Sequence, residues 1–183
     1  MDSGAFSAYT LGEKQSIRAY CAWLRRYKGT IDHYAVLDDI ESPQKTWDNQ
    51  LFMESEGMKP VPCFHYGEPV KWLHQYIDAG HEYIALGGMV PIDTKALLSW
   101  LDDLWFNHLC NVKGEPRVRV HGFGLTTFEL MDRYPWYSVD SSTWIQAARF
   151  GEVVVNFDGN LHRIRISEKS SKVGEKGNHY LTE

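Results

Sequence analysis

Short runs rich in β-branched and aromatic residues alternate with longer amphipathic stretches along most of this chain. The runs predict strands at Ser3–Phe6, Tyr34–Ile40, Val61–Tyr66, Tyr83–Met89, Arg117–Leu125 and Trp136–Ser141. The stretches between them predict helices at Glu13–Tyr27, Thr46–Glu56, Val70–Ala79, Asp93–Leu109 and Thr126–Tyr134. Strands that alternate with helices predict a parallel sheet, because each helix returns the chain to the edge where the next strand begins. We therefore expect an α/β protein.

Several helix ends carry local signals of their own. Asp93 precedes an apolar helical pattern, and Thr126 followed by Glu129 has the spacing of a capping box. Residues that stop helices follow several of the predicted helices, at Gly29, Gly57, Gly80 and Pro135. The helix ends therefore support the same alternation as the helix interiors.

A TIM-type barrel and a doubly wound sheet both alternate in this way, and two features favour the barrel. The units recur every roughly 20–35 residues, near the ~30 residues per unit of a barrel with eight strands. Nearly every predicted strand also ends in polar residues or glycine, and a barrel brings all its strand ends to one mouth. Only six strand–helix units are present. We therefore expect a (β/α) TIM-type barrel that lacks its first two strands, in a chain truncated relative to a longer relative.

The predicted domains follow from this division. Residues 1–151 are expected to form the partial barrel, which would be the catalytic domain. Residues 152–166 predict a β-hairpin attached to the barrel, turning at Asp158-Gly159, because Asp-Gly favours two-residue hairpin turns. Residues 167–183 are rich in Ser, Lys, Glu and Gly, and we expect a flexible tail there.

Composition bears on the compartment and on the partners. The three cysteines are widely spaced and odd in number, which argues against a disulfide framework and a CxxC zinc knuckle and favours a reducing cytoplasm. No apolar run approaches the roughly 20 residues that span a bilayer. The formal net charge of −5 is unusual for a protein that binds nucleic acid through phosphates, although basic residues gather between Arg149 and Lys176.

Two aspartates at strand ends are the candidate catalytic residues. Asp2 has small neighbours in Ser3, Gly4 and Ala5, which would leave room for a substrate, although it could equally be an ordinary residue near the terminus. Asp140 follows a predicted strand, where it could act as a nucleophile or base at a barrel mouth or merely cap a helix.

Other strand-end residues are candidates for substrate binding. Asp38 could accept two N–H bonds from a guanine edge, or belong with Asp39 to a solvated turn. Gly87 and Gly88 would let a flat ligand approach the backbone, or simply form a tight turn. His65 and His121 also end strands. Lone histidines are more often satisfied structural residues than ligands, but two of them beside two aspartates would make a credible metal site.

In order along the chain, these motifs resemble those of the tRNA-guanine transglycosylases, which insert queuine, archaeosine or related 7-deazaguanines into tRNA, and of their phage relatives that modify DNA. The resemblance runs from Asp2 to about Ile166. The motifs that carry it are Asp2-Ser3-Gly4-Ala5-Phe6, Leu37-Asp38-Asp39, Ala85-Leu86-Gly87-Gly88, His121-Gly122-Phe123-Gly124 and Val139-Asp140. The predicted hairpin also stands where the family has one.

The resemblance implies a role for each motif. Asp140 would be the nucleophile that attacks the sugar, Asp2 the general acid and base, and Phe6 the ring that stacks on the base. Asp38 and His65 would contact the edge of the base. The Gly87-Gly88 backbone and the His121 motif would complete its pocket. The implied substrates are a guanine nucleotide in tRNA or DNA and a free 7-deazaguanine, with no organic cofactor.

The chain departs from the family at three places. His65 stands where the family has glutamine, His121 stands where it has methionine, and no cluster of three cysteines and one histidine follows the hairpin. We therefore expect no structural zinc, and these departures favour a phage-encoded or divergent relative acting in the host cytoplasm.

Two other interpretations of the residues remain open. A metal-dependent TIM-barrel hydrolase would use His65, His121, Asp38 and Asp140 as ligands. A truncated, inactive binding module would use none of them for catalysis.

Overall fold

The computed structural model describes residues 1–125, 127–141, 148–149, 151–157 and 160–166. Its centre is a four-stranded parallel sheet in the order β1-β2-β3-β4, formed by Cys63–His65, Tyr83–Gly87, Arg119–Gly122 and Ser138–Val139. Neighbours in the sheet are also consecutive strands of the chain. The predicted parallel α/β organisation is confirmed.

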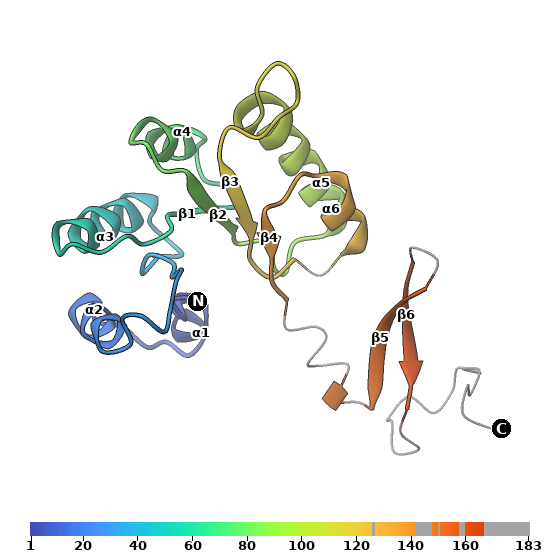
Figure 1. The fold of residues 1–183 in the computed structure, drawn as a ribbon, viewed down its shortest axis with the longest axis horizontal. Helices are drawn as coiled ribbons and strands as arrows, with labels where there is room; N and C mark the ends of the chain where they lie inside the picture. Colours follow the sequence, from blue (N-terminus) through green and yellow to red (C-terminus); the bar gives the residue numbers. More distant parts are fainter. Residues whose placement is uncertain (126, 142–147, 150, 158–159, 167–183) are drawn as a thin grey trace.

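Helices flank these strands, and the first two of them share a second core cluster with Cys63 and Ala85. They are α1 (Ala5–Thr10), α2 (Ile17–Arg26), α3 (Pro43–Ser55), α4 (Lys71–Asp78), α5 (Thr94–Asp103) and α6 (Phe128–Arg133), with a π-helical segment, η1 (Leu104–Leu109), continuing α5. Figure 1 shows α3 to α6 in an arc around the sheet. Asp93 caps α5 as predicted, because its carboxylate accepts the Ala96 N–H at 3.0 Å. Thr126 of the predicted capping box lies outside the described residues.

Alternate side chains of the strands fill the core between the sheet and the helices. The fully buried members of this core include Phe64, Ile84, Leu86, Val120, Leu101 and Leu109. Burying each such side chain contributes about 1.5–3 kcal/mol. Because successive residues of a strand point to opposite faces, Cys63, Ala85 and His121 point to the other face of the sheet. The candidate site lies on that face.

The predicted strand at Ser3–Phe6 is wrong, because α1 already begins at Ala5. Gly4 has a φ of 77°, which turns the chain, and Ser3 Oγ accepts the Ala5 N–H at 3.1 Å. Before this turn the Met1 carbonyl accepts the Ala35 N–H at 2.9 Å. The aromatic residue suggested a strand, but the local turn and cap decide for a helix.

The predicted strand at Tyr34–Ile40 forms only an isolated parallel bridge between Ala35 and Val61. The two backbones run side by side there, and the Val36 N–H donates to the Val61 carbonyl at 2.9 Å. Beyond the bridge, the Leu37 carbonyl accepts from Asn49 Nδ2 of α3 at 2.7 Å. The Asn49 side chain thus takes the place of a backbone N–H from a neighbouring strand. The segment therefore lies beside β1 without forming a regular strand.

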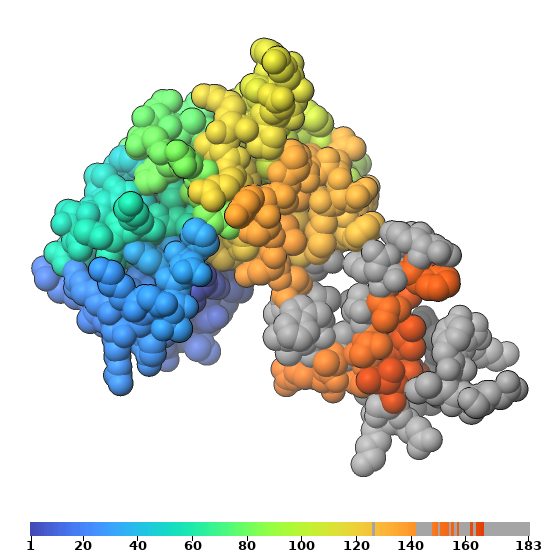
Figure 2. Space-filling view, in the orientation of Figure 1, coloured from blue at the N-terminus to red at the C-terminus, as the bar shows by residue number. Residues whose placement is uncertain are grey.

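After the α/β part, β5 (Glu152–Phe157) and β6 (Asn160–Arg165) pair antiparallel. Figure 2 shows this hairpin to one side of the α/β part. The predicted turn residues Asp158 and Gly159 and the predicted tail lie outside the described residues. No helix among the described residues is long and apolar enough to cross a membrane.

Candidate functional site

A cavity of about 290 Å³ lies at the carboxyl ends of the parallel strands. Seven of the eight predicted site residues line it: Asp2, Phe6, Asp38, His65, Gly87, Gly88 and Asp140. The remaining lining residues are Ile40, Cys63, Met89, Val90, Phe123 and Gly124. The eighth predicted residue, His121, is not part of this lining. Residues predicted from separate motifs are therefore neighbours in space.

The register of the sheet explains why these residues meet. His65 ends β1 and pairs with Gly87, which ends β2, while Asp140 directly follows β4. One step deeper on the same face, Cys63 pairs with Ala85. Since residues two apart on a strand share a face, Cys63 and His65 both face the cavity.

A buried chain of hydrogen bonds holds His65. Its Nδ1 lies 3.0 Å from Glu68 Oε1, and its Nε2 lies 2.9 Å from Asp38 Oδ2. The other Asp38 oxygen, Oδ1, accepts from the Ser3 hydroxyl at 2.6 Å. Glu68 also accepts the backbone N–H of His65 at 3.1 Å. Both carboxylates and the ring between them are thus fixed in one arrangement.

Two carboxylates facing both ring nitrogens favour the doubly protonated, positively charged imidazole. Burial alone would lower the pKa of His65, but the Cys63 sulfur and the hydrogen bonds to Asp38 and Glu68 raise it well above its ordinary value. The two carboxylates therefore favour a proton on each ring nitrogen of His65.

Cys63 lies directly behind this histidine. Its thiol is buried, and Sγ lies 3.5 Å from His65 Nε2. Burial raises the pKa of the thiol to about 11. The donor atoms of Asp38, Cys63 and His65 all lie within 4.8 Å of one another, which makes these three a group among the described residues that could hold a metal ion.

Gly87 leaves the space that the His65 ring occupies. A Cβ built at Gly87 would lie 2.9 Å from His65 Cδ2 and 3.1 Å from Cys63 Sγ. The first distance is shorter than real Cβ contacts and the second is tighter than most, so a side chain here would force the neighbours to shift. The predicted role of Gly87 in admitting a flat ligand stays a prediction, and the structure adds a second reason for a glycine here, because a Cβ would crowd His65 and Cys63.

Asp140 stands at the exposed side of the cavity. Its Oδ1 accepts the Gly124 N–H at 2.7 Å, and half of its side chain, 51%, is exposed. The alternative prediction was that Asp140 caps a helix. Residues 142–147, which would begin that helix, lie outside the described residues, so this alternative stays a prediction.

His121 lies beside Asp140 rather than in the cavity lining. Its Nδ1 contacts Ser138 Oγ at 2.7 Å, and its Nε2 lies 4.0 Å from Asp140 Oδ2. Burial lowers the pKa of His121 below its ordinary value, although Asp140 raises it in part. The alternative metal site of His65, His121, Asp38 and Asp140 does not assemble among the described residues, where the donor group that meets is Asp38, Cys63 and His65.

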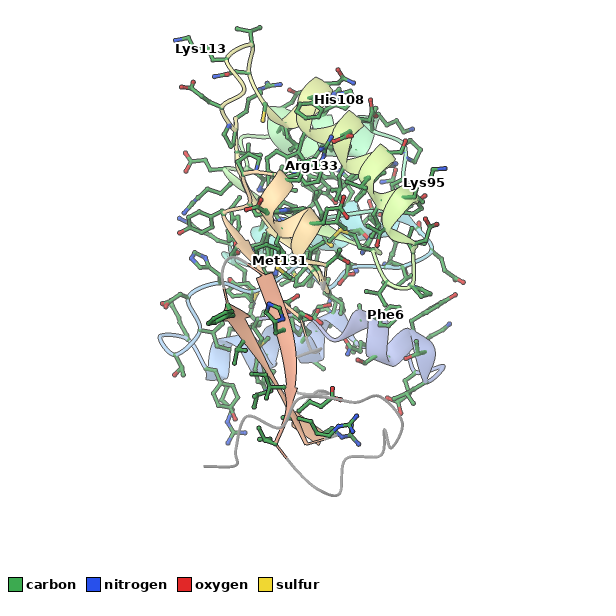
Figure 3. The ribbon with its side chains drawn as sticks, turned by 90° about the vertical axis from the view of Figure 1, so that its right-hand side faces the viewer. Phe6, Lys95, His108, Lys113, Met131 and Arg133 are labelled. Carbon is green, nitrogen blue, oxygen red and sulfur yellow. The ribbon has the colours of Figure 1, made fainter. Side chains whose placement is uncertain are left out.

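Asp2 and Phe6 also line the cavity. Partial burial raises the pKa of Asp2, the Gly4 N–H lowers it, and the nearby Asp38 and Asp140 carboxylates raise it further. The Phe6 side chain is 48% exposed although it lines the cavity. Figure 3 shows Phe6 on α1, well separated from Lys113 and His108 at the other end of the α/β part.

Sequence reasoning missed three residues of this site: Ser3 as a partner of Asp38, Cys63, and Glu68. Cys63 had one usable signal, since it stands two residues before His65 on a predicted strand and so had to share its face. Glu68 had none, because its contact with His65 depends on the turn after β1.

Comparisons of the chain with protein-family models, with curated proteins and with solved structures found no match.

Proposed function

We propose that this protein is a base-exchange transglycosylase, similar to the tRNA-guanine transglycosylases, that replaces guanine in tRNA or DNA with a 7-deazaguanine. One observation carries the proposal: seven motif residues, spread from Asp2 to Asp140 along the chain, line a single cavity. The order of the motifs alone does not require this convergence. It is the arrangement that a reaction using two aspartates and a stacked base needs.

Asp140 is the nucleophile of the proposed reaction. Its carboxylate bonds to C1′ of the sugar as the bond from C1′ to guanine breaks, and the electron pair leaves with the base. The Gly124 N–H holds Oδ1, while the exposure of the side chain leaves room for the sugar. The covalent intermediate is then opened by the incoming 7-deazaguanine at the same carbon.

Asp2 moves the proton of the base. The departing guanine must gain a proton, and the incoming base must lose one before it attacks. A catalyst for both steps works best when its pKa lies near the working pH. The raised pKa of Asp2 is a shift in that direction.

Phe6 stacks on the base, while Asp38, His65 and the Gly87-Gly88 backbone contact its edge. Asp38 accepts N–H groups of the base in addition to its bonds with Ser3 and His65, since each carboxylate oxygen has two lone pairs. The target nucleotide must leave its stack to reach this cavity.

The barrel is part of the proposal. Its support is the chain order of β1 to β4, extended by the backbone hydrogen bonds that join Val36 to Val61 and Ala35 to Met1. Consecutive parallel segments in chain order are typical of barrels, whereas doubly wound sheets reverse their order at a switch point. We also propose a cytoplasmic location, consistent with free Cys21, Cys63 and Cys110.

The test is guanine exchange, followed with labelled guanine in tRNA and in duplex DNA, together with detection of a covalent adduct on denaturing gels. Asp140→Asn keeps the size of the side chain and removes the anionic nucleophile, so both exchange and adduct should disappear. Asp2→Asn should slow exchange by about 10²–10⁴-fold while some adduct still forms.

Asp132→Asn is the matched control, because Asp132 is an exposed aspartate of α6 that does not line the cavity. It should exchange guanine at the parent rate. Exchange at the parent rate by Asp140→Asn would show that Asp140 is not the nucleophile and that the mechanism is wrong.

A further inference from the structure

We propose that Asp38, Cys63 and His65 form a binding site for one divalent transition-metal ion, zinc in the first place, in the wall of the cavity. The three residues come from two neighbouring segments, the loop that holds Asp38 and strand β1, and all three line the cavity. Their donor atoms lie within 4.8 Å of one another. The inference rests on this cluster and not on the transfer reaction.

The distances between the donors suit a small ion. Ligands of tetrahedral zinc at 2.0–2.3 Å lie about 3.3–3.8 Å apart. The separation of 3.5 Å between Cys63 Sγ and His65 Nε2 falls in that range. The separation of 2.9 Å between His65 Nε2 and Asp38 Oδ2 would open by a few tenths of an ångström as the ion replaces the proton between them.

The chemistry of the donors selects the metal. One thiolate, one imidazole and one carboxylate are ligands that zinc accepts, whereas magnesium and calcium prefer oxygen alone. Three protein ligands leave a fourth position open, as catalytic zinc sites do. That position would face the cavity, because Asp38, Cys63 and His65 all contribute to its lining.

A second layer of contacts orients two of the three ligands. Glu68 Oε1 lies 3.0 Å from His65 Nδ1, which leaves Nε2 of the ring directed at the cluster. The Ser3 hydroxyl donates to Asp38 Oδ1, which leaves Oδ2 for the ion. Histidines that bind metals almost always donate their second ring N–H to a carboxylate or carbonyl group in this way. Glu68 is thus a positioning residue of the proposed site.

The absence of a CxxC cluster led the sequence prediction to expect no zinc. That reasoning addressed a structural site built from one short motif, whereas these donors meet only because β1 lies beside the segment that carries Asp38. If the proposed base exchange is correct, the open position would also place a Lewis acid beside the carbonyl oxygen of the departing base. That last step rests on the proposed function.

The experiment measures metal in the full chain. After removal of metal with a chelator, the protein is dialysed against Zn²⁺, and bound zinc is counted; one ion per chain is expected. Co²⁺ loaded in its place should give the near-ultraviolet charge-transfer absorption of a thiolate bound to cobalt. Cys63→Ser should abolish that absorption, while Cys21→Ser and Cys110→Ser, the other two cysteines, should keep it.

Glu68→Gln guards against loss through misfolding, because it leaves all three ligands in place. It should weaken zinc binding by about 10–100-fold while the thermal unfolding transition is retained. Failure of the parent protein to bind zinc, or a cobalt absorption that survives Cys63→Ser, would overturn the proposed site. Asp140→Asn separates the two proposals, since it should lose guanine exchange and keep its zinc.

Discussion

At the scale of single residues, the tightest constraint in the site is the missing side chain of Gly87. A Cβ on Gly87 would lie only 2.9 Å from the His65 ring and 3.1 Å from Cys63 Sγ. The position of the ring in turn decides which atoms face Asp38 and Glu68. One glycine therefore determines the geometry of the charged cluster without making a polar contact itself.

We predict that Gly87→Ala destabilises the protein by about 1–3 kcal/mol, the usual cost of overpacking a buried position. The free energy of unfolding in urea measures this loss. Gly87→Ala combined with His65→Ala should cost less than the sum of the two single changes, because the second substitution removes the atom that clashes. Additive losses would show that the ring yields without cost and that Gly87 does not position it.

Asp2 gives a prediction about pH. Its folded-state pKa is raised above the ordinary value of 3.8, so the folded protein holds this proton more tightly than the unfolded chain does. The resulting stability is complete below pH 3.8 and is lost as the pH rises through the folded-state pKa. At neutral pH this contribution is reduced or lost, and Asp2→Asn, which stays neutral, should raise the Tm slightly.

That gain should vanish below pH 3.8, where the parent side chain is itself neutral. Thermal unfolding at pH 7 and at low pH measures both values. Asp132→Asn, an exposed change outside the cavity, should leave the Tm at pH 7 unchanged. A gain from Asp2→Asn that persists unchanged in acid would show that ionisation of Asp2 is not its source.

At the scale of elements, the start of α5 is determined by one side chain. The Asp93 carboxylate accepts the Ala96 N–H, which otherwise has no partner within the helix. Asp93→Ala should lower the free energy of unfolding by about 1 kcal/mol, measured in urea. Asp48→Ala is the control, because Asp48 is an exposed aspartate inside α3, where alanine is a better helix former. An equal loss in both variants would argue against capping.

Elements whose boundaries depend on neighbouring residues were predictable, and those whose boundaries depend on distant residues were not. Asp93 and the leucines that follow it are close in the chain, so the sequence predicted the start of α5 correctly. The segment after Val36 looked like a strand, but its hydrogen bonds are decided by Asn49 in the next helix. The false strand at Ser3–Phe6 is the exception, because the turn at Gly4 that decides it is local and was overlooked.

The candidate site shows the same division. Motif resemblance predicted seven residues that line the cavity, since each lies at the end of a run that alternates recognisably. It assigned no role to Cys63 or Glu68, because their importance depends on the placement of the His65 ring. It also placed His121 in the pocket of the base, but His121 does not line the cavity and contacts Ser138.

At the scale of the whole molecule, the described residues form two parts of very different packing. The inner strands β2 and β3 have paired neighbours on both sides, and their Ile84, Leu86 and Val120 side chains are fully buried. Strands β5 and β6 pair with each other, and within the described part of the chain neither packs extensively against another element. A two-stranded hairpin alone is marginally stable in water.

We therefore predict two levels of amide hydrogen exchange in the intact chain. Amides of β2 and β3 should exchange only through global unfolding, because opening these strands exposes the main core. Amides bonded between β5 and β6 should exchange far faster, through local opening of the hairpin.

Low concentrations of urea should accelerate the slow class and leave the fast class nearly unchanged, since local opening exposes little surface. Mass spectrometry of peptides covering residues 83–87 and 152–157 distinguishes the two classes. If the hairpin peptide were as protected as the β2 peptide, the hairpin would have to be held by the rest of the molecule, and the two parts would unfold as one.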